Sequence, residues 1–417
     1  MNNMKNTILR RVGITKLIAV VLLVTGVMGC SEDDSIANLG DLQVQLELVT
    51  GLSDISLEGV EVSVTNTVDN ATIESITDAN GSVLFTNLSV GTYTVVATNT
   101  TDDYTLSGTA NNVSVSIQET TVATVEVNAV NSDGGLVIKE VYSSGSGYIT
   151  LFKDSFIEIF NNSAETLYAD GMYIANIYGD TGMSGDTALY SVLTDSDYVY
   201  TDVMSQIPGD GTDYPIASGQ SIVIALNAVN YKEGSTAPDT QLNNTDATLE
   251  HYSIDWLEAQ GRAGNSFFEL DNPAVPNMTN IYMFNETNFF RLATASSSVV
   301  LISNEATFSD SDIVDYTESG STTTYKLMKI SVDQVIDAVD ILDNSGAADF
   351  KRIPSALDGG FTYVNADGAI SYTGLSSRRK IDDVASDRFG RTILIDTNNS
   401  TVDFEAIDFP DKYGYNN

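Results

Sequence analysis

Residues with chemically reactive side chains are few in this 417-residue chain, which has one cysteine, Cys30, and one histidine, His251. A single cysteine can form no intramolecular disulfide and no cysteine-based zinc or iron–sulfur site. His251 lies in the stretch TLEHYSIDWLEAQ, close to several acids. A helix there would place His251 and Asp255 one turn apart, yet one imidazole and one carboxylate do not fill a coordination shell. We therefore expect His251 to serve packing or the surface, with a weak metal site or catalysis as the alternatives.

Other catalytic patterns are absent or unspecific. The sequence has no G-x-S-x-G elbow, phosphate-binding loop, dinucleotide fingerprint or H-E-x-x-H motif. With 57 Asp and Glu residues, some carboxylates must lie close together in any fold. A pair of carboxylates is the machinery of glycoside hydrolysis, and its separation is a three-dimensional quantity. We predict no catalytic residue, no metal ligand and no cofactor-binding residue, with a glycan-active hydrolase that uses paired carboxylates as the alternative.

Acid-rich turns could hold calcium through carboxylate and carbonyl oxygens. Three stretches qualify: DANGS (Asp78–Ser82), YGDTGMSGD (Tyr178–Asp186) and FSDSDIVD (Phe308–Asp315). The first lacks the alternating acids and the distal Glu of a helix-flanked calcium site, so it favours a hairpin turn. We expect solvated turns at the other two and no cofactor, with calcium as the weaker alternative.

Basic residues gather near the C-terminus, at Arg378, Arg379, Lys380, Arg388 and Arg391. These are five of the 15 basic residues that follow the N-terminal segment. Arginines in so acidic a chain are expected to pair with its own carboxylates, bidentately where geometry allows. The alternative is contact with an anion or a partner.

The overall charge excludes whole classes of partner. Residues 1–29 hold four basic residues and no acid, which leaves 15 basic against 57 acidic residues, a net charge of −42, in the rest. Such a surface repels nucleic acid, because binding phosphate requires cationic side chains. We expect no nucleic-acid partner and a chain adapted to a salty external medium.

The N-terminal segment has the layout of a signal peptide over residues 1–29. Basic residues end at Lys16, a 12-residue apolar run spans Leu17 to Met28, and Cys30 follows Gly29. The run is too short for a membrane-spanning helix, which needs about 20 residues. Residues 30–40 are small and polar, as expected of a tether.

The motif VMGC, which ends at Cys30, resembles the lipobox of bacterial lipoproteins. The resemblance implies cleavage before Cys30 and lipidation of its thiol, and two or three acyl chains hold a protein firmly on a membrane. The acids of SEDD (Ser31–Asp34) resemble the export signal that places Bacteroidetes lipoproteins on the outer face of the outer membrane. The alternatives are a plain secretory signal and a merely solvated tether.

Residues 41–130 alternate apolar and polar side chains between turns, as in LQVQLELV (Leu42–Val49) and VEVSVTN (Val60–Asn66). About seven short strands without a helix are typical of a two-sheet β-sandwich. Three pieces, Leu57–Val64, Thr77–Phe85 and Leu88–Val95, resemble the carboxypeptidase-regulatory-like, prealbumin-type module. That resemblance implies a seven-stranded Ig/prealbumin-like fold that serves as a spacer or docking unit.

We expect residues 135–417 to form a second, larger domain. The matching pieces Ile138–Val141, Phe156–Asn161 and Asp170–Ile174 resemble the opening of a lamin-tail-type β-sandwich. We expect a long insertion at about residues 226–290 and a C-terminal extension at about 326–417. Loops and insertions are where binding sites usually lie.

The extension contains the one helix that we predict, over SVDQVIDAVDIL (Ser331–Leu342). Its apolar residues fall at helical spacing, and Ser331 with Gln334 forms a capping-box pattern. The tail, including Ile353–Val364 and Gly390–Phe404, resembles an uncharacterised Bacteroidetes lipoprotein family with this two-part layout. Members of that family are regarded as accessory lipoproteins, often beside TonB-dependent receptors.

The sequence therefore predicts a mostly β, surface-exposed outer-membrane lipoprotein that is anchored through Cys30. We expect a non-enzymatic binding or accessory module, partnered by a TonB-dependent receptor or another surface protein in nutrient or metal uptake.

Overall fold

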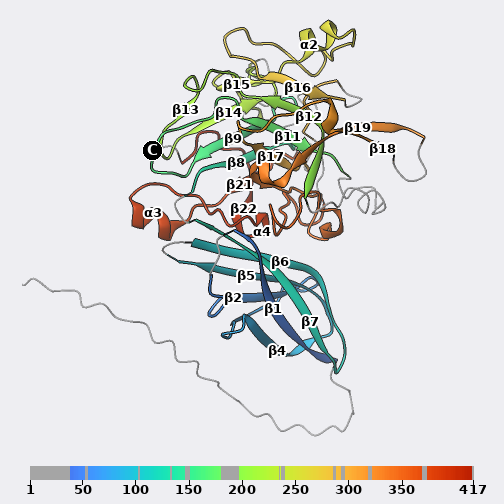
Figure 1. Ribbon diagram of the computed structural model, residues 1–417, viewed down its shortest axis with the longest axis vertical. Coiled ribbons are helices and arrows are strands. Elements are labelled where there is room, and N and C mark those ends of the chain that lie inside the picture. The colour runs from blue at the N-terminus through green and yellow to red at the C-terminus, as the bar shows by residue number, and fades with distance from the viewer. Residues whose placement is uncertain are drawn as a thin grey trace, which may run out of the picture. The chain divides into compact units, whose positions relative to one another are not determined.

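The computed structural model describes residues 38–415, apart from 52–54, 102–103, 132–133, 146–150, 180–196, 234, 236–239, 285–287, 293–295, 318–321 and 369–372. Nearly all of its regular structure is β-strand, which confirms the predicted mostly β class (Figure 1).

Seven strands form the first domain and pair as one sheet in the order β3-β2-β5-β6-β7-β1-β4. Their bounds are β1 (Leu39–Gly51), β2 (Glu61–Asn66), β3 (Thr72–Ile76), β4 (Ser82–Ser89), β5 (Gly91–Thr100), β6 (Tyr104–Val115) and β7 (Thr120–Asn131). The seven strands predicted for this part of the chain are confirmed.

The alternation in the sequence decides which face of this sheet is buried. Leu42, Val44 and Leu46 of β1 point to one face and are at most 2% exposed. They share a core with Phe85 of the edge strand β4 and Val64 of β2, although β4 and β2 lie far apart in the strand order. The sheet must therefore curl around its own core, as Figure 1 shows.

The turn at Asp78–Ser82 was predicted as a hairpin, and the pairing part of that prediction is wrong. Gly81 does adopt a positive φ of 70°, and the Asp78 carboxylate accepts N–H groups from Asn80 and Ser82 at 2.9 and 3.0 Å. However, the strands it joins, β3 and β4, lie at opposite ends of the sheet order. Turn chemistry fixes the local backbone, whereas the partner of β4 is decided by the long pairing with β1.

The second domain contains fifteen further strands among its described residues, most of them in two sheets. Their bounds are β8 (Leu136–Tyr142), β9 (Phe156–Asn161), β10 (Leu167–Tyr168), β11 (Tyr173–Ile177), β12 (Tyr198–Gln206), β13 (Pro215–Ile216), β14 (Ser221–Ala225), β15 (Leu249–Glu250), β16 (Thr279–Met283), β17 (Val299–Ile302), β18 (Ile313–Thr317), β19 (Thr324–Ser331), β20 (Val335–Val339), β21 (Ser376–Arg379) and β22 (Phe404–Ile407).

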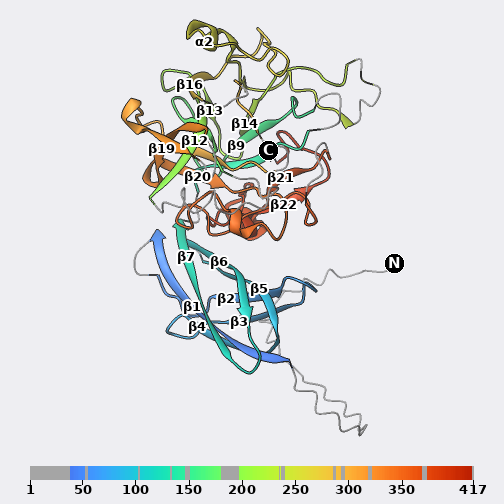
Figure 2. The same cartoon turned by 90° about the vertical axis from the view of Figure 1, so that its right-hand side faces the viewer.

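The two sheets stack as a sandwich. One has the order β18-β19-β12-β11-β17-β20, with β16 on β12, and the other has the order β15-β14-β9-β8-β21-β22. Ile138 of β8 and Ile159 of β9 pack in one core with Ile174 of β11 and Leu301 of β17. Figure 2 shows the layer of β12, β19 and β20 beside the layer of β9, β21 and β22.

The C-terminal segment covers the outer face of the second sheet. Every residue of β8 and β9 is buried, so these strands are covered on both faces. Val137 and Phe160 contact Leu394, and Phe156 belongs to a cluster that Tyr413 joins. The extension is therefore part of the packed fold.

The insertion at about 226–290 is also built into the sandwich. Its strand β15 pairs with β14, and its strand β16 pairs with β12. Between them lies the short helix α2 (Ile254–Ala259).

The helix predicted over Ser331–Leu342 is wrong. The segment ends β19, makes one 3₁₀ turn, η4 (Val332–Gln334), and continues as β20. The Ser331–Gln334 capping box is present, but it caps only that turn. Branched side chains such as Val335 and Val339 favour strands, and pairing with β17 satisfies their backbone.

The other helical elements among the described residues are short. They are α3 (Asp383–Phe389), α4 (Ser400–Asp403), and the 3₁₀ turns η3 (Asp310–Asp312) and η5 (Ala348–Phe350). The Asp382 side chain caps α3, and Gly390 ends it with a φ of 66°.

Candidate functional site

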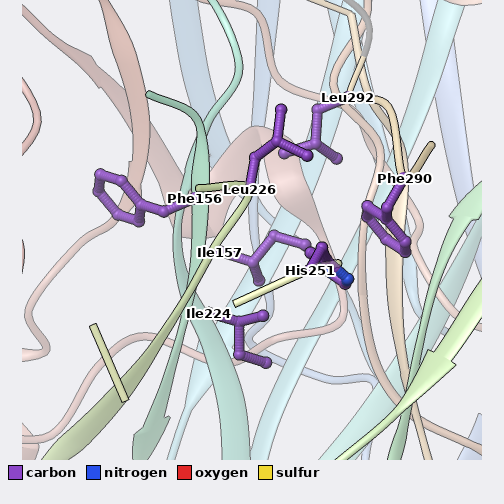
Figure 3. A pocket seen from close by; sticks show the side chains of 7 residues that line it. All are labelled: Phe156, Ile157, Ile224, Leu226, His251, Phe290 and Leu292. Carbon is purple, nitrogen blue, oxygen red and sulfur yellow. The ribbon is translucent and has the colours of Figure 1, made fainter. Parts of the chain in front are cut away.

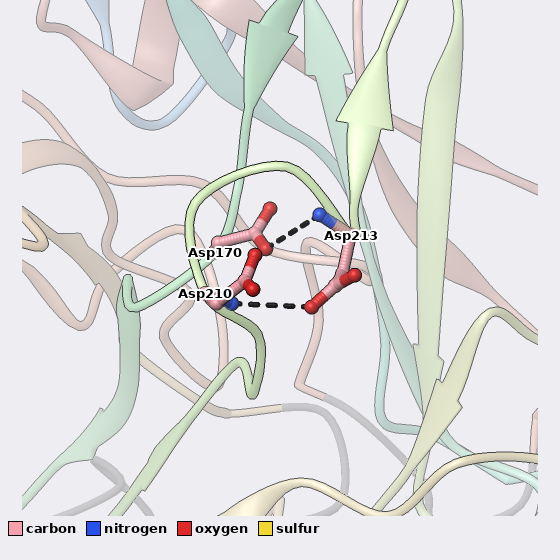
Figure 4. Close-up of side chains that lie close together, drawn as sticks. All are labelled: Asp170, Asp210 and Asp213. Atoms are coloured by element: carbon pink, nitrogen blue, oxygen red, sulfur yellow. Dashed lines mark hydrogen bonds between the residues drawn. The ribbon is translucent and has the colours of Figure 1, made fainter.

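Three carboxylates meet where the loop before β13 folds against Asp170, the second residue after β10. Asp170, Asp210 and Asp213 bring carboxylate oxygens within 4.8 Å of one another (Figure 4). Asp170 is buried, whereas Asp210 and Asp213 are exposed. In the described part of the chain, this is the one group of three or more His, Cys, Asp or Glu side chains whose possible metal-binding atoms lie this close together.

Backbone N–H groups hold the buried member of this acidic triad. The Asp170 carboxylate accepts N–H donors from Gly211, Asp213 and Tyr214 at 3.1, 2.8 and 2.9 Å. Burial alone would raise the pKa of Asp170, but these donors outweigh it and lower the pKa. Gly209 is required here, because an added Cβ would lie 2.1 Å from the Asp170 carboxylate.

The triad offers oxygen donors of the kind that a hard cation such as calcium prefers. Sequence reasoning missed it. The local signal is GDGTD (Gly209–Asp213), a glycine-spaced pair of acids, but Asp170 is remote in sequence and joins the pair only through the fold.

The three calcium candidates from the sequence lie elsewhere. The Asp78 carboxylate is engaged in its own turn. Residues 180–186 lie outside the described residues. In Phe308–Asp315, the Asp312 carboxylate accepts the Ser309 N–H at 2.8 Å, and Asp315 pairs with Lys326 at 2.6 Å. This stretch forms the self-capped 3₁₀ turn η3 followed by strand β18.

His251 is buried beside the start of the insertion helix, and not in it. The helix begins at Ile254, so His251 and Asp255 are not one helical turn apart. The imidazole stacks on Phe290, with centroids 3.8 Å apart and an angle of 8° between the planes. It lines an apolar pocket whose walls are Phe156, Ile157, Ile224, Leu226, Phe290 and Leu292 (Figure 3).

Neither ring nitrogen of His251 has a hydrogen-bond partner among the described residues. The space in the pocket does not admit a water-sized sphere. Burial lowers the pKa of His251 to about 3, because the charged imidazolium has no solvent or counter-charge there. The described surroundings thus fit the predicted packing role.

Arg379 of the basic cluster lies inside the second domain with 1% of its surface exposed. Its guanidinium donates to both oxygens of Asp337 at 2.9 and 2.7 Å, and to Asp396 and Asp403 at 3.1 Å each. It also donates to the Ile138 carbonyl at 2.9 Å. The guanidinium therefore ties β21 to β20, β8 and the C-terminal segment.

The neighbouring arginine faces the other side of β21. Arg378 pairs with Glu405 at 2.8 Å and with Asp411 at 3.3 Å, both at the surface. The predicted pairing with the chain's own carboxylates is confirmed for these two arginines. Arg391 donates to the Asn162 carbonyl and lies near the Phe389 ring.

Two glutamates stand opposite each other on β8 and β9, where Glu140 pairs with Glu158 in register. Burial raises the pKa of Glu140 to about 7 and also raises that of Glu158. Ser376 donates to Glu140 at 2.6 Å. Lys139 pairs with Glu158 at 2.8 Å, with both side chains fully buried.

The C-terminal tail closes over this glutamate pair. The Asp411 N–H donates to Glu140 at 3.2 Å, and the Tyr413 N–H donates to Glu158 at 3.0 Å. The Lys139 ammonium donates to the Gly414 carbonyl. The pair therefore fastens the tail to the sheet and does not face an open cleft.

Cys30 and the rest of residues 1–37 lie outside the described residues. Within the described part of the chain, no helix has the length and apolar character needed to cross a membrane.

The described fold contains a seven-stranded sheet followed by a larger β-sandwich, and comparison with known proteins matches these two parts to different families. Residues 50–132 match the family described as a prealbumin-like fold domain. Residues 217–411 match the family described as Protein of unknown function (DUF4876). The second domain is thus similar, over residues 217–411, to that family of unknown function, and the first domain is similar to the prealbumin-like fold. The search of curated proteins found no match.

One solved structure shares the fold over most of the chain. It is the crystal structure of a DUF4876 family protein from Bacteroides thetaiotaomicron, with 24% identity and a TM-score of 0.55 over 88% of this chain and 94% of that one. The major pilin SpaD of Corynebacterium diphtheriae matches with 16% identity and a TM-score of 0.17 over 36% of this chain and 42% of that one. A putative carbohydrate binding protein of Bacteroides uniformis matches with 13% identity and a TM-score of 0.17 over 45% and 98%.

Proposed function

We propose that this chain is a lipoprotein anchored through Cys30 to the outer face of the outer membrane, where it acts as a non-enzymatic binding or accessory module. Its partner is a TonB-dependent receptor or another surface protein in nutrient or metal uptake. The support for the location is the motif VMGC followed by SEDD (Val27–Asp34). The finer domain likenesses, to a carboxypeptidase-regulatory-like module and a lamin-tail-like domain, belong to the same proposal.

The observation that carries the non-enzymatic role is how the chain uses its buried ionisable groups. Buried side chains with raised pKa values are where catalytic acids and bases are usually sought. Here Asp337 and Asp403 neutralise Arg379, and Glu140 and Glu158 fasten the tail. These groups hold the fold together, which supports a rigid scaffold that presents its loops to a partner.

The alternative is a glycan-active hydrolase with paired carboxylates. The specific observation in its favour is the Glu140–Glu158 pair, in which burial raises the pKa of Glu140 to about 7, a value suited to a general acid. Against it, the tail residues Asp411 and Tyr413 occupy the oxygens that a substrate would need. A hydrolase would have to lift the tail first.

Co-purification tests the proposal. The full chain carries a C-terminal tag and is recovered from outer membranes dissolved in a mild detergent, after brief crosslinking of intact cells. We expect one outer-membrane protein to be recovered with it in a fixed ratio. The control is Cys30→Ser, which should be released from the membrane and recovered without that protein. Recovery of the anchored chain alone, without partner or ligand, contradicts the proposal.

A second assay distinguishes the binding proposal from the glycan-active hydrolase. Glu140→Gln and Glu158→Gln are compared with the unmodified chain on a panel of polysaccharides, with release of reducing ends as the readout. The binding proposal expects no turnover by any of the three. Turnover that both substitutions abolish would establish the hydrolase instead.

A further inference from the structure

Strand β3 forms an open edge of the first sheet. It pairs with β2 on one side, and it pairs with no other strand among the described residues. All five of its residues, Thr72–Ile76, are exposed. An edge of this kind presents unpaired backbone N–H and C=O groups to any extended chain that approaches.

The hydrogen bonds at both ends of β3 show which backbone groups point outward. The Thr77 N–H donates to the Val60 carbonyl at 3.0 Å, and the Asn66 N–H donates to the Ala71 carbonyl at 2.9 Å. Hydrogen bonds to the partner strand involve every second residue of an antiparallel pair, so the backbone N–H and C=O of Ile73 also point toward β2. The backbone groups of the residues between them, Thr72, Glu74 and Ile76, therefore point away from the sheet.

The side chains on this edge are also suited to contact. Ile73 stands opposite the fully buried Val64 but is itself 49% exposed, so the apolar core continues to the open edge. Ile76 is 65% exposed on the other face. Natural edges are usually protected by lysine, proline or a bulge, and β3 has none of these.

The charge of the first domain indicates which kind of segment could pair with the open edge of β3. No Lys, Arg or His occurs between Lys16 and Lys139, so every charged residue of the first domain is acidic. Glu58, Glu61 and Glu74 are exposed on or beside this edge. A second copy of the chain would bring acids against acids, which disfavours pairing of β3 with itself, while a cationic segment would be attracted.

We propose that β3 is a docking edge for an extended segment of a partner protein that alternates apolar and cationic residues and adds to the sheet as an eighth strand. Backbone hydrogen bonds to Thr72, Glu74 and Ile76 supply the affinity, and burial of Ile73 together with the acids beside it supplies the selectivity. The inference goes beyond the proposed function, and it requires neither the anchor nor the triad.

The test uses a fluorescent peptide of alternating valine and lysine, a second peptide with glutamate in place of lysine, and fluorescence anisotropy on the full chain from Ser31 onward. We expect binding of the lysine peptide only. Glu74→Pro should weaken it by about tenfold, because it removes an outward N–H and spares the bonds to β2. Glu74→Gln removes the same charge without touching the backbone, and should weaken binding by only about threefold.

A peptide methylated on alternate backbone nitrogens probes the same bonds without changing the protein, and it should also fail to bind. Hydrogen exchange should slow at Thr72, Glu74 and Ile76 when the lysine peptide is bound. Absence of binding overturns the proposal, as does binding that Glu74→Pro and backbone methylation leave unchanged. Dimers of the free chain that Glu74→Pro disrupts would also overturn it, in favour of a second copy as the occupant.

Discussion

Replacement of Arg379 by methionine is the most informative single change in the second domain. The side chain keeps its apolar stem but loses hydrogen bonds to Asp337, Asp396, Asp403 and the Ile138 carbonyl. Three carboxylates, two of them almost fully buried, are left without their cation.

The loss of unfolding free energy in Arg379→Met follows from the burial of the carboxylates that Arg379 contacts. Removing one partner of a buried ion pair typically costs about 3–5 kcal/mol, because the remaining charge has neither solvent nor counter-ion. Even beside Arg379, burial raises the pKa of Asp337 to about 6 and that of Asp403 to about 7. Without the arginine both acids protonate still more readily. We therefore expect the full cost near pH 7 and a clearly smaller cost near pH 5.

Urea unfolding measures this directly, because Trp256 is the only tryptophan and packs against the core of the second domain. The control is Arg378→Met, one residue away, whose partners Glu405 and Asp411 are 43% and 52% exposed. It should cost about 1 kcal/mol or less. Equal midpoints for the two variants near pH 7, or no recovery of Arg379→Met near pH 5, would refute the reasoning.

Three more substitutions test other parts of the account. His251→Phe should stabilise the second domain by about 1–2 kcal/mol near pH 7, since two unpartnered buried nitrogens are removed. Burial depresses the pKa of His251 to about 3, so the native chain should lose stability as the pH falls below about 6.5. Urea titration of His251→Phe should not show this loss. The raised pKa of Glu140 has the opposite effect: its contribution to stability is complete below about pH 4.5 and is lost as the pH rises through about 7. The free energy of unfolding, measured by urea titration, should therefore fall by about 3 kcal/mol over that window, and Glu140→Gln should abolish this fall. Asp170→Ala removes the acceptor of three backbone N–H groups and should speed hydrogen exchange at Asp213 and Tyr214 at least tenfold, while a native-like rate there would show that the loop holds itself.

The first domain was predictable because its information is local. In β1 the alternation of Leu42, Gln43 and Val44 already indicates which face of the strand is buried. What the pattern could not give is the partner of each strand. The turn at Gly81 was recognised, yet the strands on either side of it pair elsewhere, because pairing is decided by contacts between distant segments.

The second domain misled sequence reasoning where a strand lacks a strict alternation of buried and exposed residues, as in β20. In β20, Val335 and Val339 fit a helical period as well as they fit a strand, and Asp337 looks like a solvent-facing residue. Its role appears only when Arg379, far along the chain, donates to it. The acidic triad was missed for the same reason, since Asp170 is not near Gly209–Asp213 in sequence.

The central claim, that lipid on Cys30 holds this acidic β-protein on the outside of the cell, is tested by combining two readouts in one experiment. Cells expressing the full chain or Cys30→Ser are fed an alkyne-tagged fatty acid and then treated, while intact, with a protease. We expect that the native chain carries the tag, sediments with membranes and is digested, whereas Cys30→Ser carries no tag and does not sediment. A Cys30→Ser chain that still sediments with membranes, or a native chain that intact cells protect completely, would contradict it.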